Sequence, residues 1–270
     1  MPVQTVREFL SFDYEAFFPR GSFFSTFAPP IVPTGAVILY LLLSKPVCSF
    51  LVKALGIAPK GQLIQSLTIV HSSSLAMYSL WTFIYSAQIV LNSISEEGLW
   101  PTVCGSYESL WVNRGLEFWI THFYISKFYE FVDTWIILLK SREPSLLQTF
   151  HHAGIAILMW GLTITAASPV LVVVVFNSFI HTLMYTYYVM AAFNIKSFLK
   201  PYLTSMQVIQ FLIGLSITLQ THFIPGCLNE AQDFVIWCME IYTIVLIFLF
   251  IAFYVENYVS KRNNKSPKDE

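Results

Sequence analysis

A glutamine and two adjacent histidines begin one of the apolar segments of this chain. Gln148, His151 and His152 directly precede residues 153–167, which are mainly apolar. In a helix, where successive side chains turn by about 100°, the three would share one polar face. Imidazole can serve as a metal ligand, a general base or a nucleophile. This stretch is therefore a candidate reactive centre.

Three further polar clusters interrupt other apolar segments. Lys127 and Glu130 are three positions apart, which favours an ion pair on one helix face. Such a pair can also be purely structural, and Gln207 and Gln210 can simply bond helices together. The three clusters are Lys127, Glu130, Asp133 and Thr134; Asn177, His181, Met184, Tyr185 and Tyr188; and Thr204, Gln207 and Gln210.

The composition indicates an integral membrane protein. Of the 270 residues, 56% are hydrophobic and 11% are charged, and the mean hydropathy is +0.62. A soluble domain is about 25% charged, so this much apolar surface does not fit inside one soluble core. The net charge of −1 gives no indication of nucleic-acid binding. Ionisable side chains at membrane depth are costly and usually functional, which strengthens the case for the clusters.

Seven apolar segments are long enough to cross a bilayer, which requires roughly 20 residues. We predict an all-α membrane protein with a seven-helix transmembrane domain over residues 31–258. A lumenal N-terminal segment, 1–30, precedes it, and a cytosolic polar tail, 259–270, follows it. The second and third segments could instead enter the membrane only in part. The seven segments are residues 31–53, 66–92, 116–139, 148–167, 169–193, 202–223 and 234–258.

The distribution of Lys and Arg predicts the orientation. Eleven of the 15 lie on one side of the predicted spans and three lie on the other. Since cytosolic loops are enriched in Lys and Arg, the C-terminus is predicted to be cytosolic and the N-terminus lumenal. In this topology all four polar clusters fall in the cytosolic halves of their spans. The simplest architecture is a bundle around a polar chamber that opens to the cytosol.

The same topology makes a prediction about the four cysteines. Cys104 and Cys227 fall in lumenal loops, where disulfides persist, so we predict that they are bonded to each other. Cys48 and Cys238 fall inside spans and are predicted to be small buried hydrophobes.

A metal site is an alternative interpretation of the histidines. Membrane di-iron desaturases also use paired histidines, but they need more than the six of this chain, in several boxes. A single zinc held by His151, His152 and His181 is conceivable, although the chain has no His-x-x-x-His pair. His71 and His222 stand alone and are predicted to be structural. We predict no metal site.

Acyl transfer fits the clusters better. A nucleophilic imidazole can accept an acyl group from a thioester, while a second histidine and carboxylates adjust protonation and amides or hydroxyls hold the developing oxyanion. The apolar bundle would hold a long alkyl chain. Basic side chains at the cytosolic end would face the phosphates of a carrier such as coenzyme A. They are Lys140, Arg142, Lys196, Lys200, Lys261 and Arg262.

Four motifs follow one another in a specific order, although any one alone would be a weak signal. They are Lys127-x-x-Glu130-x-x-Asp133-Thr134, the box at 148–152, Asn177-x-x-x-His181-x-x-Met184-Tyr185-x-Tyr187-Tyr188, and Thr204-x-x-Gln207-x-x-Gln210. The ending Phe253-Tyr254-x-x-x-Tyr258-x-x-Lys261-Arg262 completes them. Over residues 127–262 the chain thereby resembles the ELO family of very-long-chain fatty acid elongases.

The resemblance implies seven helices around a narrow acyl-chain tunnel, an endoplasmic reticulum location and the condensing step of elongation. In that step a long-chain acyl-CoA and malonyl-CoA give 3-oxoacyl-CoA, CO2 and CoA, with no tightly bound cofactor. By position the nucleophile would be His151, and His152 and His181 would assist in proton transfer and malonyl binding. The implied partners are the ketoacyl reductase, the dehydratase and the enoyl reductase that complete the cycle. Supporting residues would be Gln148, Lys127, Glu130, Asp133, Asn177, Tyr185, Tyr188, Gln207 and Gln210.

Gln148 stands where the family box His-x-x-His-His has its first histidine. Glutamine cannot act as acid, base or nucleophile, but it can orient a neighbouring imidazole or bind a carbonyl. Residues 147–152, Leu-Gln-x-Phe-His-His, resemble the subgroup that acts on Δ9-unsaturated C18 polyunsaturated chains. Linoleoyl- and α-linolenoyl-CoA are therefore the predicted substrates. Lys265 and Lys268 do not form the usual dilysine retrieval signal.

A receptor or transporter with seven spans is the alternative from another class, and a metal-dependent lipid desaturase is the third. Neither an Asp-Arg-Tyr nor an Asn-Pro-x-x-Tyr signature occurs in the chain. The sequence leaves chain-length limits and the oligomeric state open, with a homodimer among the alternatives.

Overall fold

The computed structural model describes residues 3–11, 23–197 and 199–256, and every structural statement below concerns these residues. This part of the chain is helical and contains no strand. In chain order its elements are α1 (Val6–Ser11), a 3-10 helix (Phe23–Thr26), α2 (Ile31–Leu55), α3 (Gln62–Glu97), α4 (Leu99–Val103), a π-helix (Tyr107–Asn113), α5 (Leu116–Tyr129), α6 (Phe131–Leu139), α7 (Leu146–Ile164), α8 (Val170–Ala192), α9 (Leu199–Thr221) and α10 (Glu230–Tyr254).

Five of the described helices are long and apolar enough to cross a membrane, namely α2, α3, α8, α9 and α10. They match the first, second, fifth, sixth and seventh predicted spans, and α3 continues unbroken for 36 residues. The predicted fourth span is α7, which has 19 residues. It falls outside this set because Gln148, His151 and His152 lower its hydropathy.

The predicted third span is broken at Glu130 into α5 and α6. These helices have 14 and 9 residues, so neither is long enough to cross a membrane alone. Neither proline nor glycine occurs at the break. Instead the turn tightens, because the N–H of Asp133 donates to the carbonyl oxygen of Glu130, three residues back, at 3.1 Å. The tightened turn therefore coincides with the carboxylates of the first polar cluster.

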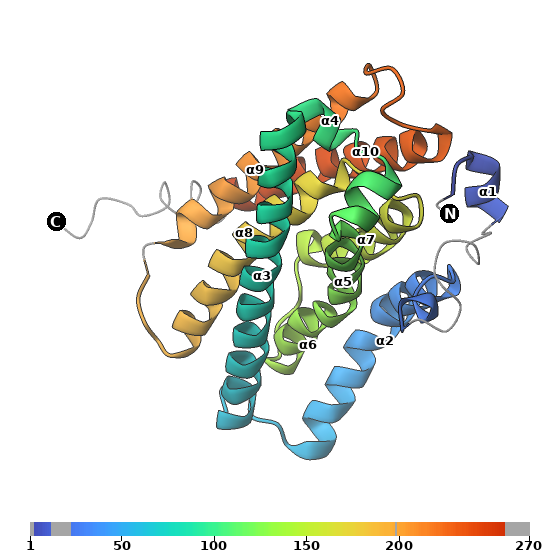
Figure 1. The fold of residues 1–270 in the computed structure, drawn as a ribbon. Coiled ribbons are helices and arrows are strands. Elements are labelled where there is room, and N and C mark those ends of the chain that lie inside the picture. The colour runs from blue at the N-terminus through green and yellow to red at the C-terminus, as the bar shows by residue number, and fades with distance from the viewer. Residues whose placement is uncertain (1–2, 12–22, 198, 257–270) are drawn as a thin grey trace.

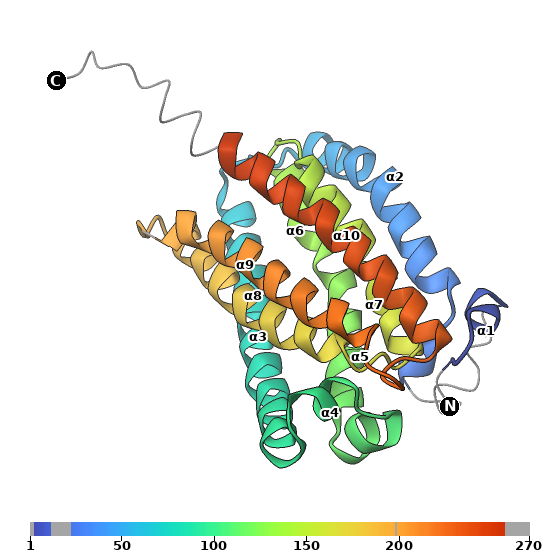
Figure 2. The same cartoon turned by 90° about the horizontal axis from the view of Figure 1, so that it is seen from above.

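The helices form one bundle (Figures 1 and 2). α3 packs along α8, α10 lies between α7 and α9, and α2 lies at the edge against α6 and α7. The end that holds the α2–α3, α6–α7 and α8–α9 loops is called the basic end, since Lys60, Lys140, Arg142 and Lys196 lie in those loops. The opposite end holds the α9–α10 loop and is called the disulfide end.

Covalent and ionic contacts fasten the disulfide end. Cys104 and Cys227 are joined by a disulfide across 123 residues, as the sequence predicts. Arg114, after the π-helix, pairs with Glu96 and Glu97 at the end of α3. Outside the disulfide, Cys48 is buried as expected, whereas Cys238 is only partly buried.

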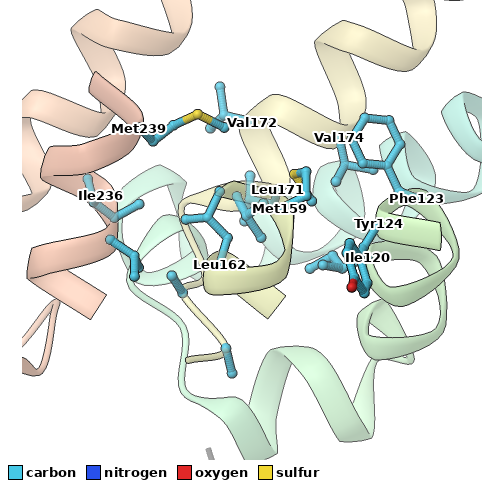
Figure 3. Packing of buried hydrophobic residues seen from close by; sticks show 14 of the residues in the cluster. Ile120, Phe123, Tyr124, Met159, Leu162, Leu171, Val172, Val174, Ile236 and Met239 are labelled. Carbon is cyan, nitrogen blue, oxygen red and sulfur yellow. The ribbon is translucent and has the colours of Figure 1, made fainter. Parts of the chain in front are cut away.

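An apolar core joins α5, α7, α8 and α10, with further members from α3, α4 and the π-helix. Figure 3 shows side chains of α5, α7, α8 and α10 meeting in this core. Their burial removes apolar surface from solvent and lipid and sets the distances between the helices that carry the polar clusters. The labelled members are Ile120, Phe123 and Tyr124; Met159 and Leu162; Leu171, Val172 and Val174; and Ile236 and Met239.

Candidate active site

The histidine box occupies the first turns of α7. The side chain of Ser145 accepts a hydrogen bond from the N–H of Gln148 at 3.1 Å, which caps the helix and fixes where it begins. The side-chain amide of Gln148 lies 2.8 Å from Nε2 of His152, one helical turn away. Gln148 thus orients the buried imidazole of His152, which is one of the two roles that a glutamine can fill at this position.

Tyr242 of α10 fixes the tautomer of His151. Its hydroxyl donates to the backbone carbonyl oxygen of His151 at 2.9 Å, and its oxygen lies 3.2 Å from Nδ1 of the same residue. Because the hydroxyl hydrogen is already used, the oxygen can only accept a hydrogen bond from Nδ1–H. Nε2 of His151 then carries the lone pair that a nucleophile or a general base requires.

A glycine permits the contact between Tyr242 and the histidine box. A Cβ at Gly154, in α7, would overlap the ring of Tyr242. Phe150 stacks on that ring with the centroids 5.2 Å apart. α10 can therefore approach α7 at the level of His151. Sequence analysis missed Tyr242, because a single tyrosine in an apolar run gives no sign of its partner.

A buried ion pair lies among the same helices. Lys127 Nζ is 2.7 Å from Oε1 of Glu130, with side-chain exposures of 1% and 3%. Oδ1 of Asn177 accepts from the same ammonium at 3.4 Å, and Nδ1 of His181 lies 3.6 Å from the same Glu130 oxygen. The pair expected from the sequence spacing thus links the α5–α6 break to α8. Oε2 of Glu130 has no hydrogen-bond partner among the described residues.

Asp133 of α6 forms a second carboxylate centre. The hydroxyl of Tyr185 donates to Oδ2 at 2.6 Å, and Nε2 of His71 lies 3.0 Å from Oδ1. The prediction that His71 stands alone is therefore wrong, since α3 packs against α6 and α8 and brings it to Asp133. Hydropathy predicts that α3 is a membrane span, but it does not indicate which face of the helix packs against the polar cluster that contains Asp133.

Thr134 connects the box to the outer helix α2. Its Oγ1 lies 2.8 Å from the hydroxyl of Tyr40 and 3.5 Å from Nε2 of Gln148. Tyr40 is a further residue that sequence analysis missed, and it stacks on Phe131 with the ring centroids 4.3 Å apart. The histidine box is thus held by contacts from α2, α6 and α10.

Two cavities meet at His151. The wider cavity has a volume of about 790 Å³ and reaches the basic end. His152, His181, Asp133 and Tyr185 line it together with His151. The narrower cavity, of about 60 Å³, lies among mainly apolar side chains of α8, α9 and α10. A thioester placed at His151 could therefore direct an apolar chain one way and a polar carrier the other.

The amides of α9 lie at this junction. Gln210 is buried and lines both cavities, and its Oε1 has no hydrogen-bond partner among the described residues. Gln207 lines the wider cavity, and its amide nitrogen is 3.5 Å from the sulfur of Met184. Asn177 also lines both cavities, while Tyr188 lines the wider one. The side-chain oxygen of Gln210 is therefore open to a bound hydrogen-bond donor.

The wider cavity has basic residues at its mouth. Lys140 and Arg142 line it as expected, and so does Lys60, which sequence analysis did not assign. Burial lowers the pKa of the Lys140 ammonium, and the charge of Arg142 lowers it further. Lys196 is exposed and is not part of the lining. The side chain of Lys200 and all of Lys261 and Arg262 lie outside the described residues.

Within the described ranges, no three His, Cys, Asp or Glu side chains are placed to bind one metal ion. The fold and the wide cavity define a multi-pass membrane protein in which imidazoles, a carboxylate and amides line a common chamber. Residues 25–266 match the protein-family model described as ELO: GNS1/SUR4 family, and the chain belongs to this family.

Several relatives carry the name of elongases. Fatty acid elongase 2 of Trypanosoma brucei brucei is 27% identical over 217 residues, which cover 76% of this chain and 80% of the relative. Fatty acid elongase sre1 of Dictyostelium discoideum is 30% identical over 211 residues, which cover 76% of this chain and 75% of the relative. Very long chain fatty acid elongase 4 of Macaca mulatta is 33% identical over 153 residues, which cover 54% of this chain and 48% of the relative. The resemblance is confirmed at the level of the family, and fatty acid elongation is the activity that it supports.

Proposed function

We propose that this protein catalyses the condensing step of fatty acid elongation. A long-chain acyl-CoA and malonyl-CoA give 3-oxoacyl-CoA, CO2 and free CoA, through an acyl group carried on His151. The observation that carries the proposal is the position of His151, with Nε2 unprotonated, where a polar cavity meets a narrow apolar one.

The first step transfers the acyl group to the imidazole. The lone pair of Nε2 attacks the thioester carbonyl, the N–C bond forms, and the C–S bond breaks to release the CoA thiolate. The positive charge that develops on the ring is stabilised because Nδ1–H donates a hydrogen bond to the hydroxyl oxygen of Tyr242. The amide of Gln210, at the same junction, is placed to donate to the carbonyl oxygen as it becomes an oxyanion.

The second step forms the new carbon–carbon bond. Malonyl-CoA loses CO2, and the electron pair of the broken bond remains on the α-carbon as an enolate. That carbon attacks the acyl-imidazole carbonyl, the C–N bond breaks, and the neutral imidazole of His151 is restored. His152 and His181, which line the wider cavity, bind the malonyl group and hold protons during this step.

Lys60, Lys140 and Arg142 hold the phosphates of CoA at the mouth of the wider cavity. The basic end then faces the cytosol of the endoplasmic reticulum membrane, in agreement with the positive-inside rule. In this topology α5 and α6 together cross the membrane as the third span and α7 as the fourth, so the narrow cavity is part of an acyl tunnel. The product passes to a ketoacyl reductase, a dehydratase and an enoyl reductase.

The box Leu-Gln-x-Phe-His-His supports Δ9-unsaturated C18 polyunsaturated acyl-CoAs as substrates. The test uses purified protein in lipid vesicles with malonyl-CoA and saturated, monounsaturated and polyunsaturated C18 acyl-CoAs. We expect 3-oxoacyl-CoA and CO2 in equal amounts, fastest with linoleoyl- or α-linolenoyl-CoA. Preference for a saturated chain would overturn the substrate assignment alone, whereas extension of no chain would overturn the proposed function.

A further inference from the structure

A second histidine–carboxylate cluster lies at the disulfide end. Nδ1 of His222 is 2.6 Å from Oδ1 of Asp233, and Nε2 is 3.2 Å from Oε2 of Glu240. The side chain of His222 is only 5% exposed, and its ring stacks on Trp237 with the centroids 4.3 Å apart. The prediction that His222 stands alone is therefore wrong, because the end of α9 packs against α10.

Glu240 connects this cluster to the narrow cavity. The residue is 2% exposed and lines the same narrow cavity as His151. Its Oε1 has no hydrogen-bond partner among the described residues. The two threonines nearby are already engaged, since Thr218 donates to the carbonyl of Leu215 and Thr243 to that of Met239. The narrow cavity, which is lined mainly by apolar side chains, thus includes one unpartnered carboxylate oxygen.

The contacts of the cluster leave Oε1 without a hydrogen-bond donor. The ring nitrogens of His222 face Oδ1 of Asp233 and Oε2 of Glu240, so neither of them reaches Oε1. A buried carboxylate oxygen without a hydrogen bond is costly. A hydroxyl group would supply the missing bond. It can donate to the carboxylate, and it can equally accept from Glu240 in its protonated form.

The cavity has the direction that an acyl chain on His151 would follow. Two residues of α9, Gln210 and Thr218, line it as well. They are eight residues apart on α9, which corresponds to about 12 Å at the rise of an α-helix. A chain attached at His151 and lying in this cavity therefore brings one of its carbons beyond the reaction centre next to Glu240.

We propose that Glu240 binds a hydroxyl group carried by the acyl chain, so that hydroxylated long-chain acyl-CoAs are a substrate class of this protein. This inference rests on the proposed function, since it places the acyl group on His151. His222 and Asp233 hold the carboxylate of Glu240 in place and do not contact the substrate. The cavity then favours acyl chains that carry a hydroxyl group at one particular distance from the thioester.

The test compares unsubstituted C18 acyl-CoA with a series in which one hydroxyl occupies successive positions from mid-chain to the methyl end. Purified wild-type protein in vesicles is supplied with malonyl-CoA, and kcat/KM is measured for each chain. We expect one position to be favoured by about tenfold over the unsubstituted chain, as one hydrogen bond to a buried carboxylate provides. If the unsubstituted chain is preferred over every hydroxylated chain, the inference is wrong. If no chain is extended at all, the proposed function itself fails.

Two variants attribute the preference to Glu240. Glu240→Leu removes the acceptor, so the preference for the hydroxylated chain is expected to disappear, whereas Glu240→Gln keeps an acceptor and should retain part of it. Glu230→Gln changes an exposed carboxylate on the same helix and should leave the preference unchanged. An unchanged preference in Glu240→Leu would assign the hydroxyl to another residue and contradict the proposal. Should Glu240→Leu not fold, the wild-type series and Glu240→Gln still decide the question.

Discussion

Histidine–carboxylate contacts occur both around the wide cavity and at the disulfide end of the bundle, but their surroundings differ. Around the wide cavity, His71 contacts Asp133 and His181 approaches Glu130, and the space beside them reaches the basic end. At the disulfide end, His222 bridges Asp233 and Glu240 next to a loop that a disulfide holds.

The side chains of the two regions are held in different ways. Around the wide cavity, side chains from α2, α3, α6, α8 and α10 position one another through hydrogen bonds, and Oε1 of Gln210 is left open to a bound group. At the disulfide end, a covalent bond and the ion pairs of Arg114 hold the loops. Substitutions of the hydrogen-bonded histidines and their partners around the wide cavity should therefore lower catalysis, the buried pair of Lys127 and Glu130 should also support the fold, and loss of the disulfide should lower stability.

The buried pair of Lys127 and Glu130 should give the largest loss of stability. Lys127→Met leaves a buried carboxylate without its cation, so we expect a loss of about 3–5 kcal/mol in the free energy of unfolding. Lys45→Met is the matched control, because its pair with Glu143 has side chains 66% and 71% exposed and should contribute less than about 1 kcal/mol. Unfolding in detergent measures both, and equal losses would contradict the importance of burial.

Loss of the disulfide should come next. Cys104→Ser opens a loop that the bond closes over 123 residues, and removal of a native disulfide typically costs about 2–5 kcal/mol. We expect a lower unfolding temperature with little change in kcat at temperatures where the protein stays folded. Cys238→Ser, at a free and partly buried cysteine, is the control and should behave like the wild type. A large fall in kcat at low temperature would show that the two regions are not separate.

Tyr242→Phe should affect catalysis more than stability. The substitution removes the hydroxyl that accepts a hydrogen bond from Nδ1–H of His151. Both tautomers of the imidazole then become accessible, and a smaller fraction of the protein has an unprotonated Nε2. We expect kcat to fall by about tenfold, which corresponds to one hydrogen bond of about 1.4 kcal/mol. Tyr129→Phe, whose hydroxyl contacts Ser74 at an exposed position, should leave kcat unchanged. An unaltered kcat in Tyr242→Phe would argue against tautomer control.

The smallest expected effect is the one that titration of Lys140 has on the KM for acyl-CoA. Burial and the charge of Arg142 lower the pKa of its ammonium. The positive charge is present below that pKa and is lost above it, so KM for acyl-CoA should rise by a few-fold at alkaline pH. Because the pKa is lowered, this rise should begin at a lower pH than the loss of charge from an exposed lysine would cause. Lys140→Arg should remove this rise because arginine stays charged. Lys196→Arg, at an exposed site outside the cavity, should retain it.

The positions of the helices were predictable from sequence, because length and hydropathy decide which segments leave water. The spacing of Lys127 and Glu130 and the order of the four motifs likewise predicted which residues would gather. The break at Glu130 was not predictable, since no proline or glycine stands there and the turn tightens around buried charges.

Contacts between helices were the part that the sequence could not supply. Whether His71 meets Asp133, Tyr242 meets His151 or His222 meets Glu240 depends on how each helix is rotated and how closely it packs. Gly154 shows the difficulty. In sequence it is one glycine in an apolar run, and only the position of α10 reveals that the Tyr242 ring occupies the space of its missing side chain.

The most direct test of the account is the mass of the intact protein after incubation with acyl-CoA in the absence of malonyl-CoA. We predict that the wild type gains the mass of one acyl group and loses it when malonyl-CoA is added. His151→Ala should show no added mass and a loss of activity of more than about a thousandfold, whereas Gln148→Ala should still be acylated, more slowly. An acyl adduct of normal amount on His151→Ala would contradict the central claim and assign the nucleophile elsewhere.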